Sequence, residues 1–200
     1  MPPPTDAPPD AATTGTWPPT ELVVLVDEDN RELGTMGKAA AHHADTPLHR
    51  GFSCYVLDRG GRVLATRRAV AKRSFGGLWT NSVCGHPGPG EHDHHAVARR
   101  AQHELGLAVS ELEPALPHYR YRAEASGLVE NEICPVYLAV TAHEPMANPG
   151  EVADHAWLPW EQFLERSRSG PAWSPWCREQ AEQLQSAGVL AAYRSRWCGG

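Results

Sequence analysis

The segment from Gly85 to Leu107 constrains the fold of this chain more than any other part of its sequence. It begins with a loop rich in glycine and proline and continues as a helical pattern in which one face is apolar. That face consists of Val97, Ala101 and Leu105. Glu91 and Asp93 suit the first turn of a helix, where negative charge complements the dipole, and Gly106 suits its end. The segment therefore predicts a preceding strand, a loop, and a helix over residues 91–105 that packs against a sheet.

Short apolar runs bounded by turn residues predict the rest of the sheet. The expected strands are residues 21–27, 51–57, 62–67, 78–84, 119–123, 132–141 and 152–157. The second and third of these flank a turn at residues 58–61 and predict a β-hairpin. Two more helices are expected at residues 160–168 and 175–187. Strands in hairpins with a few helices indicate an α+β or α/β fold, in which a mixed β-sheet lies between helices.

Composition bounds the domain organisation and the class of partner. Residues 1–19 are rich in proline, threonine, alanine and aspartate, so we expect a disordered tail there and a single domain over residues 20–197. The net charge of −6 argues against nucleic acid as the main partner. The sequence has neither the roughly 20 apolar residues of a membrane span nor a secretory signal. Five cysteines do not suggest a disulfide framework, so we expect a cytoplasmic protein that does not bind membranes.

Histidines and carboxylates with ligand-like spacing suggest a metal site. Glu130 and Glu132 are two residues apart, so an extended strand places both on one face, where they repel unless a cation lies between them. The thiol of Cys84 and the imidazole of His86 have the same spacing at a strand end. Further imidazoles come from His42, His43 and His49. Three histidines and two carboxylates suit an octahedral divalent ion, although a histidine taken alone is more often a surface residue.

The other charged clusters have two interpretations each. The tract from His92 to His95 is rich in histidine, but it falls at an expected helix start, which favours a solvated face. The pairs Arg67–Arg68 and Lys72–Arg73 either bind phosphate or form ordinary surface charge. Trp176 either belongs to the core or presents its aromatic face to a cation.

The loop and helix resemble the Nudix box, a motif in which glutamates on one helix face hold a cation that neutralises a diphosphate. The matching residues are Gly85, Glu91, Arg99, Glu104, Gly106 and Leu107. Arg100 and His103 stand where the motif has two further glutamates, and Ala101 stands where it has a bulky aliphatic residue. The loss of two carboxylates argues against hydrolysis of a diphosphate, and Arg100 suggests that a cation meets part of the phosphate charge.

Six longer segments are distinctive: residues 42–49, 67–69, 79–87, 120–122, 130–135 and 174–176. Together they resemble type 1 isopentenyl-diphosphate isomerase, a metal-dependent enzyme family with the Nudix fold. The resemblance implies reversible isomerisation of isopentenyl diphosphate to dimethylallyl diphosphate, a step that supplies isoprenoid precursors. In that reaction an acid protonates the double bond to give a tertiary carbocation, and a base removes a proton from the adjacent carbon.

The resemblance also implies a role for each matching residue. A tightly bound divalent ion (Mn²⁺, Zn²⁺ or Mg²⁺) would be held by His42, His49, His86, Glu130 and Glu132. A second ion, Mg²⁺, would bridge the diphosphate, Glu104 and the backbone carbonyl of Cys84. The diphosphate would be bound by Lys38, Arg68, Lys72 and Arg100. Cys84 and Glu132 would transfer the protons, with Tyr121 assisting Glu132 and Trp176 facing the carbocation.

The implied partner is a small prenyl diphosphate, with no flavin and no nucleic acid, and the implied assembly is a monomer or a weak homodimer. Two alternatives remain open at this point. One is a Nudix hydrolase of nucleoside or prenyl diphosphates, which Arg100 and His103 argue against. The other is a module that binds metal or diphosphate without turnover. Release of phosphate would indicate the first alternative, and binding without turnover would indicate the second.

Overall fold

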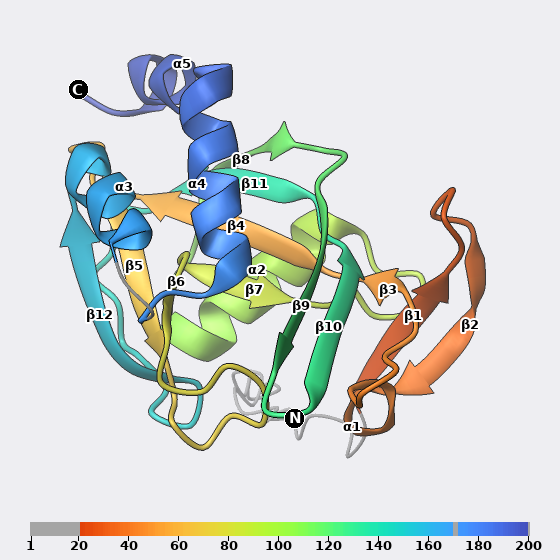
Figure 1. The fold of residues 1–200 in the computed structure, drawn as a ribbon. Helices are drawn as coiled ribbons and strands as arrows, with labels where there is room; N and C mark the ends of the chain where they lie inside the picture. The colour runs from red at the N-terminus through yellow and green to blue at the C-terminus, as the bar shows by residue number, and fades with distance from the viewer. Residues whose placement is uncertain (1–20, 170–171, 200) are drawn as a thin grey trace, which may run out of the picture.

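The computed structural model describes residues 21–169 and 172–199 (Figure 1). The strands of this part are β1 (Leu22–Val26), β2 (Glu32–Gly37), β3 (His49–Arg50), β4 (Phe52–Leu57), β5 (Val63–Arg68), β6 (Trp79–Thr80), β7 (Val83–Gly85), β8 (Ser110–Leu116), β9 (Arg120–Ala125), β10 (Leu128–Ile133), β11 (Val136–Val140) and β12 (Val152–Leu158). Its helices are α1 (Lys38–Ala41), α2 (Asp93–Leu105), α3 (Trp160–Arg168), α4 (Pro175–Ala187) and α5 (Val189–Trp197). The tail expected at residues 1–19 lies outside the described residues.

The strands form two sheets. The five-stranded sheet has the order β2-β1-β3-β10-β9, and the seven-stranded sheet has the order β12-β5-β4-β11-β8, with β6 paired to β5 and β7 paired to β4. Both sheets are mixed, because β3 pairs parallel to β10 and β4 pairs parallel to β11 among otherwise antiparallel neighbours. The expected α+β fold with a mixed sheet is therefore confirmed, although the strands divide between two sheets where the sequence predicted one.

The seven-stranded sheet is covered on both faces, with α2 on one side and α3 and α4 on the other (Figure 1). Strand β4 is buried along its whole length, as expected of a central strand. Its side chains alternate between the two layers, so that Phe52 and Cys54 pack towards α2, whereas Tyr55 and Leu57 pack with the closing helices. The sequence predicted a sheet that lies between helices, and the seven-stranded sheet is that sheet.

The chain crosses between the two sheets at two neighbouring points. Strand β3 leads into β4 through Gly51, and β10 leads into β11 through Cys134 and Pro135. Hydrogen bonds continue across the junction, from Gly51 N to the Ile133 carbonyl (2.9 Å) and from Ser53 N to the Pro135 carbonyl (3.0 Å). The single strand expected at residues 132–141 is thus wrong. Pro135 has no N–H for a ladder bond, and the strand ends there and resumes in the other sheet.

Several expected boundaries also differ from the structure. Helix α2 begins at Asp93 and not at Glu91, which precedes the N-cap residue His92. The expected hairpin between residues 51–57 and 62–67 pairs only through Leu57 and Val63, because each strand then diverges to other partners. The strand expected at residues 78–84 is interrupted, since it forms the short strands β6 and β7. The elements β2, α1, β3, β8 and α5 were not predicted.

Three further expectations concern the helices and the cysteines. In the described part of the chain, none of the helices combines the length and apolar character needed to cross a membrane. All five cysteines are free thiols, which confirms that they form no disulfide framework. Gly106 ends α2 with a φ of 63°, a left-handed conformation that glycine adopts without strain, so the predicted stop of the helix is confirmed.

Candidate functional site

Five side chains expected to hold a metal ion converge where the chain crosses between the sheets. They are His42, His49, His86, Glu130 and Glu132, and each offers a ligand atom within 4.8 Å of the others. All five are buried, although they come from four separate segments of the chain. Among the described residues, no other group of three or more His, Cys, Asp or Glu side chains has this property. The structure therefore brings together the ligand set that the sequence predicted.

Backbone carbonyls fix the orientation of two of the imidazoles. His42 Nδ1 lies 2.8 Å from the Lys38 carbonyl oxygen, and His49 Nδ1 lies 2.9 Å from that of Pro47. A carbonyl only accepts hydrogen bonds, so Nδ1 carries the proton in both rings. When these two rings are neutral, Nε2 carries a lone pair, and in each ring this atom faces a glutamate carboxylate. His42 Nε2 lies 3.0 Å from Glu130 Oε2, and His49 Nε2 lies 3.7 Å from Glu132 Oε1.

Several atoms of this group lack the partners that buried polar atoms normally have. His49 Nε2, His86 Nδ1 and Glu130 Oε2 are buried without a hydrogen bond of acceptable geometry. Burial and the charge of Glu130 raise the pKa of the Glu132 carboxyl well above its usual range. Burial also lowers the pKa of His49, so its ring favours the neutral form that binds metals. Orphaned donors, neutral imidazole and paired carboxylates together fit a divalent cation.

A cavity of about 540 Å³ adjoins this cluster. Its lining includes the four residues expected to act on the substrate's carbon skeleton, Cys84, Tyr121, Glu132 and Trp176. Tyr121 and Glu132 are register partners on β9 and β10, and the Tyr121 ring lies 5.4 Å from that of Trp176 between centroids. The cavity is therefore lined partly by aromatic rings and partly by the group of buried His and Glu side chains. Such a lining suits a short hydrocarbon chain beside a proton donor and acceptor.

Cys84 is held by Asn81, a residue to which the sequence assigned no role. The Cys84 thiol donates to Asn81 Oδ1 (3.1 Å), and the Trp176 indole N–H donates to the same oxygen (3.3 Å). Asn81 is fully buried, and its amide nitrogen donates to the carbonyls of Cys54 and Val83. Burial raises the pKa of the Cys84 thiol, which therefore keeps its proton. Asn81 thus fixes Cys84 relative to Trp176, a role that required the folded geometry to be seen.

The four cations expected to bind diphosphate all line the same cavity: Lys38, Arg68, Lys72 and Arg100. Three of them already contact a carboxylate. The Lys38 ammonium lies 3.0 Å from Glu21, and the other two contacts are Lys72 with Glu151 and Arg100 with Glu104. Arg68 differs, because its Nη2 donates to the Ser74 carbonyl (3.0 Å) and its buried Nε has no partner. The guanidinium of Arg68 also lies 5.7 Å from the Trp176 ring centroid.

The residues of the helix motif have separate tasks. Glu91 accepts two hydrogen bonds of 2.7 Å from Arg99 and one of 2.8 Å from Gly88 N, so this pair holds the loop and not a ligand. A side chain at Gly85 would meet Arg100 at 2.9 Å, so glycine lets β7 lie directly on α2. Glu104 is buried beside Arg100, but the residues that line the cavity do not include it. Its expected role with a second ion therefore remains a prediction.

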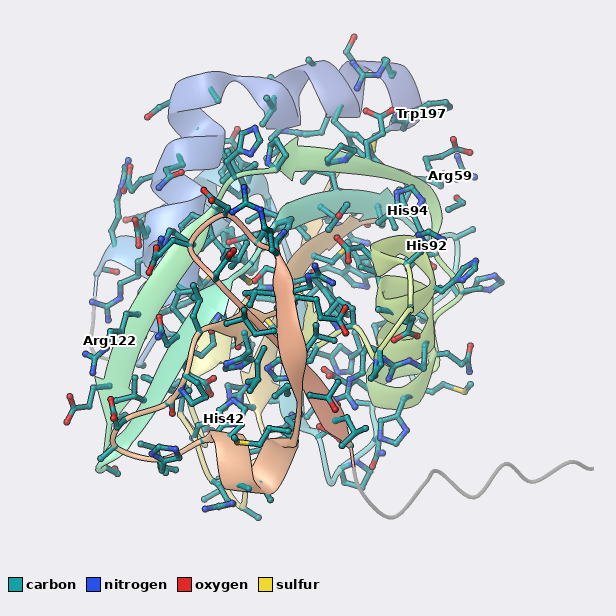
Figure 2. The ribbon with its side chains drawn as sticks, turned by 90° about the vertical axis from the view of Figure 1, so that its right-hand side faces the viewer. His42, Arg59, His92, His94, Arg122 and Trp197 are labelled. Carbon is teal, nitrogen blue, oxygen red and sulfur yellow. The ribbon has the colours of Figure 1, made fainter. Side chains whose placement is uncertain are left out.

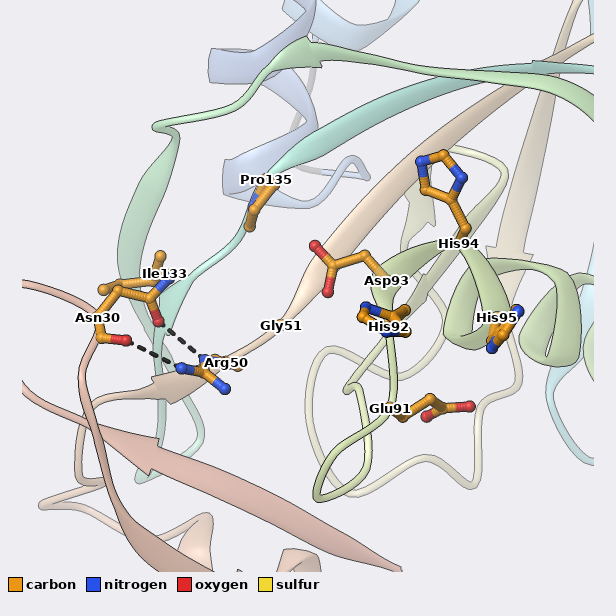
Figure 3. A pocket seen from close by; sticks show the side chains of 10 residues that line it. All are labelled: Asn30, Arg50, Gly51, Glu91, His92, Asp93, His94, His95, Ile133 and Pro135. Carbon is orange, nitrogen blue, oxygen red and sulfur yellow. Dashed lines mark hydrogen bonds between the residues drawn. The ribbon is translucent and has the colours of Figure 1, made fainter.

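The histidine-rich tract lies apart from this site. Figure 2 shows His92 and His94 on the α2 side of the molecule, well away from His42. His92, His94 and His95 are exposed, and they border a separate cavity of about 660 Å³ opposite Arg50 (Figure 3). The tract is thus a solvated surface, as the sequence predicted.

Comparisons with known proteins show which family the chain resembles. The NUDIX domain family matches residues 47–177. An isopentenyl-diphosphate Delta-isomerase from Mycolicibacterium vanbaalenii is 51% identical over 170 residues, which is 84% of this chain and 94% of that protein. The enzyme of the same name from Agromyces mediolanus is 51% identical over 178 residues, covering 88% of this chain and 86% of that protein.

Solved structures support the fold. The crystal structure of DR0079 from Deinococcus radiodurans superposes with a TM-score of 0.66 at 22% identity, covering 82% of this chain and 99% of that one. The MutT protein from Methanosarcina mazei gives a TM-score of 0.57 at 17% identity, covering 72% of this chain and 97% of that one. At these identities the likeness concerns the fold alone.

Proposed function

The chain belongs to the isopentenyl-diphosphate Delta-isomerase family of NUDIX-domain proteins, and we propose that it interconverts isopentenyl diphosphate and dimethylallyl diphosphate. The observation that carries this proposal is a single cavity whose lining combines Cys84, Glu132, Tyr121 and Trp176 with four cations. The cations of this lining suit a diphosphate, and its aromatic and proton-transfer groups suit a short alkene. As an isomerase of this kind acts by moving protons, we expect it to need no flavin.

Cys84 and Glu132 are the proposed proton-transfer groups. In the forward direction one of them protonates the terminal alkene carbon, and the electron pair of the double bond forms the new C–H bond, which leaves a tertiary cation. The other removes a proton from the adjacent CH₂, and the electrons of that C–H bond form the new double bond. The reverse reaction exchanges the two roles. An alkene is a weak base, so the acid must lie close to it in a site that excludes water.

Aromatic residues would stabilise the carbocation. The Trp176 ring is buried, lines the cavity and is fixed by its hydrogen bond to Asn81. An aromatic face attracts a cation most strongly where water is excluded. Tyr121 lies between Trp176 and the Glu132 strand, and we propose that its hydroxyl assists the carboxyl group. These groups would hold the substrate's carbon chain against the acid and the base.

The five buried ligands would hold the resident divalent ion, which is Mn²⁺, Zn²⁺ or Mg²⁺ in this proposal. That ion would supply positive charge beside Glu132 and so adjust the proton affinity of its carboxyl group. A second ion, Mg²⁺, would accompany the diphosphate with Glu104 and the carbonyl oxygen of Cys84 as ligands. Lys38, Arg68, Lys72 and Arg100 would bind the diphosphate, and the unpartnered Nε of Arg68 supports this assignment. We expect the protein to act in the cytoplasm as a monomer or a weak homodimer.

Incubation of the purified protein with isopentenyl diphosphate and Mg²⁺ in heavy water tests the proposal. The expected products are dimethylallyl diphosphate and substrate that has gained deuterium, because each turnover exchanges a carbon-bound proton with the medium. Cys84→Ala should abolish both, whereas Glu161→Gln on the exposed surface of α3 should change neither. Unlabelled substrate after long incubation, or full activity of Cys84→Ala, would contradict the proposal. Release of phosphate would instead indicate a hydrolase.

A further inference from the structure

Glu151 is a carboxylate of the substrate cavity to which the proposed mechanism gives no task. It lies in the turn before β12 and lines the cavity. Its backbone is held at both ends, since Glu151 N donates to the Asn148 carbonyl (2.9 Å) and the Glu151 carbonyl accepts from Ala69 N (2.9 Å). The neighbouring turn is tied to α2 by the bond from Asn148 N to the Glu104 carbonyl (2.8 Å). Hydrogen bonds therefore fix the backbone that carries the Glu151 carboxylate at the wall of the cavity.

The Glu151 carboxylate contacts two of the four cations proposed to bind diphosphate. One oxygen, Oε2, contacts the Lys72 ammonium and lies 3.2 Å from Arg100 Nη2. The other oxygen, Oε1, lies 3.3 Å from His103 Nε2. The charges of Lys72 and Arg100 outweigh the effect of burial and lower the pKa of Glu151 to about 2. Glu151 is thus an ionised group among the phosphate-binding cations, with a side chain that is 20% exposed.

The balance of charge shows what an incoming anion meets. Three of the four cations have a carboxylate contact, and Glu151 supplies that contact for Lys72 and shares Arg100 with Glu104. A free diphosphate carries several negative charges, so binding beside these carboxylates is opposed by repulsion. A diphosphate that carries Mg²⁺ has a smaller net charge and brings its own cation towards the carboxylates. The site is therefore arranged to distinguish the two forms of the ligand.

We propose that Glu151 is an internal counter-anion of the diphosphate site and makes that site select diphosphate complexed with Mg²⁺ over free diphosphate. This inference rests on the proposed function, because it assumes that the four cations bind a diphosphate. Glu151 fits this task better than Glu21 or Glu104. It reaches two of the cations at once, whereas Glu21 contacts Lys38 and Glu104 contacts Arg100.

The expected size of the effect follows from Coulomb's law. A carboxylate about 6 Å from a phosphate charge changes the affinity by roughly threefold at the dielectric constant of water and by roughly 100-fold at an effective value of 20. The cavity is open to solvent at its mouth but lined by buried groups, so a value between these limits applies. Removal of the Glu151 charge should therefore strengthen the binding of free diphosphate by about tenfold.

Calorimetric titration with inorganic diphosphate tests this inference. The protein is loaded with its resident divalent ion, dialysed into magnesium-free buffer without chelator, and titrated in the absence and in the presence of millimolar Mg²⁺. In Glu151→Gln the dissociation constant without Mg²⁺ should fall about tenfold, whereas the constant with Mg²⁺ should change much less. Glu151→Asp keeps the charge and should largely restore the wild-type preference for Mg²⁺. Glu161→Gln is the matched control, because Glu161 is 77% exposed on α3 and its loss should alter neither constant.

Three results would overturn the inference. Unchanged constants in Glu151→Gln would mean that its charge does not reach the ligand. Weaker binding in both buffers would mean that Glu151 only holds Lys72 and Arg100 in place. Wild-type protein that binds no diphosphate in either buffer would contradict the proposed diphosphate site as well. Deuterium exchange into isopentenyl diphosphate is measured separately, so failure of the Glu151 inference with intact exchange leaves the proposed function standing.

Discussion

Removal of the divalent ion proposed for the buried cluster should destabilise this protein, and the unpartnered atoms of the cluster give the expected size of the effect. Without an ion, His49 Nε2 is buried without a hydrogen bond, and Glu130 Oε2 has only the 3.0 Å contact with His42 Nε2, which is not a well-formed hydrogen bond. Each such atom costs about 1–3 kcal/mol, so an ion that satisfies both should stabilise the fold by about 2–6 kcal/mol. For a domain of this size each kcal/mol shifts the melting temperature by about 2–4 °C, so chelation should lower it by about 4–24 °C.

The assay is thermal unfolding by circular dichroism before chelation, after dialysis against a chelator, and after stoichiometric Mn²⁺ or Zn²⁺ is returned. The loss should be reversed by the returned ion, as linkage requires of a ligand that binds only the folded state. Cys84→Ala leaves all five ligands in place and should show the same loss. Glu130→Gln removes a ligand and should show a much smaller one. If chelation leaves the wild-type melting temperature unchanged, the cluster is not a metal site and its orphaned atoms need another explanation.

Three other predictions concern single residues around the cavity. Asn81→Leu removes the acceptor of the Cys84 thiol and the Trp176 indole, so turnover should fall by up to about 100-fold in deuterium-exchange assays. Its affinity for inorganic diphosphate should stay close to the wild-type value, and a parallel loss of affinity would instead indicate general misfolding. The guanidinium of Arg68 lies over Trp176 and has an unpartnered Nε, and Arg68→Lys removes this planar group. Calorimetry should therefore show about tenfold weaker diphosphate binding in this variant. Because the pKa of Glu151 is lowered from 4.5 to about 2, its stabilisation is present above pH 4.5 and lost as the pH falls towards 2. Urea unfolding of wild type and Glu151→Gln should therefore differ by about 1–3 kcal/mol near neutral pH and converge in acid, and a constant difference would contradict the argument.

Elements with a strong local signal were predicted from the sequence, and elements that depend on distant partners were not. Helix α2 has an apolar face and a glycine stop, both visible in the sequence. Strands β2 and β8 lie at the edges of their sheets and are mostly exposed or half-buried, so no apolar run marks them. Pro114 within β8 is tolerated at a sheet edge, but in a sequence it argues against a strand. The division of β10 from β11 likewise required the second sheet to be known.

The candidate site shows the same limit. The resemblance to a known family suggested the ligands and cations, and the structure brings them to one cluster and one cavity. Sequence spacing explains why Glu130 and Glu132 share a face, but it cannot show that His42, His49 and His86 reach them, because that depends on the crossing between sheets. Asn81 and Glu151 were missed for a related reason. Each is an ordinary polar residue in the sequence, and its role lies in what surrounds it after folding.

The substitutions in the helix motif and the carboxylate before β12 have one explanation. Arg100 and His103 occupy the two positions of α2 where the Nudix box has further glutamates, and both contact Glu151. A glutamate at either position would face Glu151 at short range, and two like charges that close together are costly. The chain therefore has cationic or neutral groups on the helix and an acid on the opposite turn, which leaves Glu104 as the one carboxylate of the helix near the site. A helix with that charge arrangement can hold a diphosphate as a handle, but it lacks the set of acids that would activate water against it.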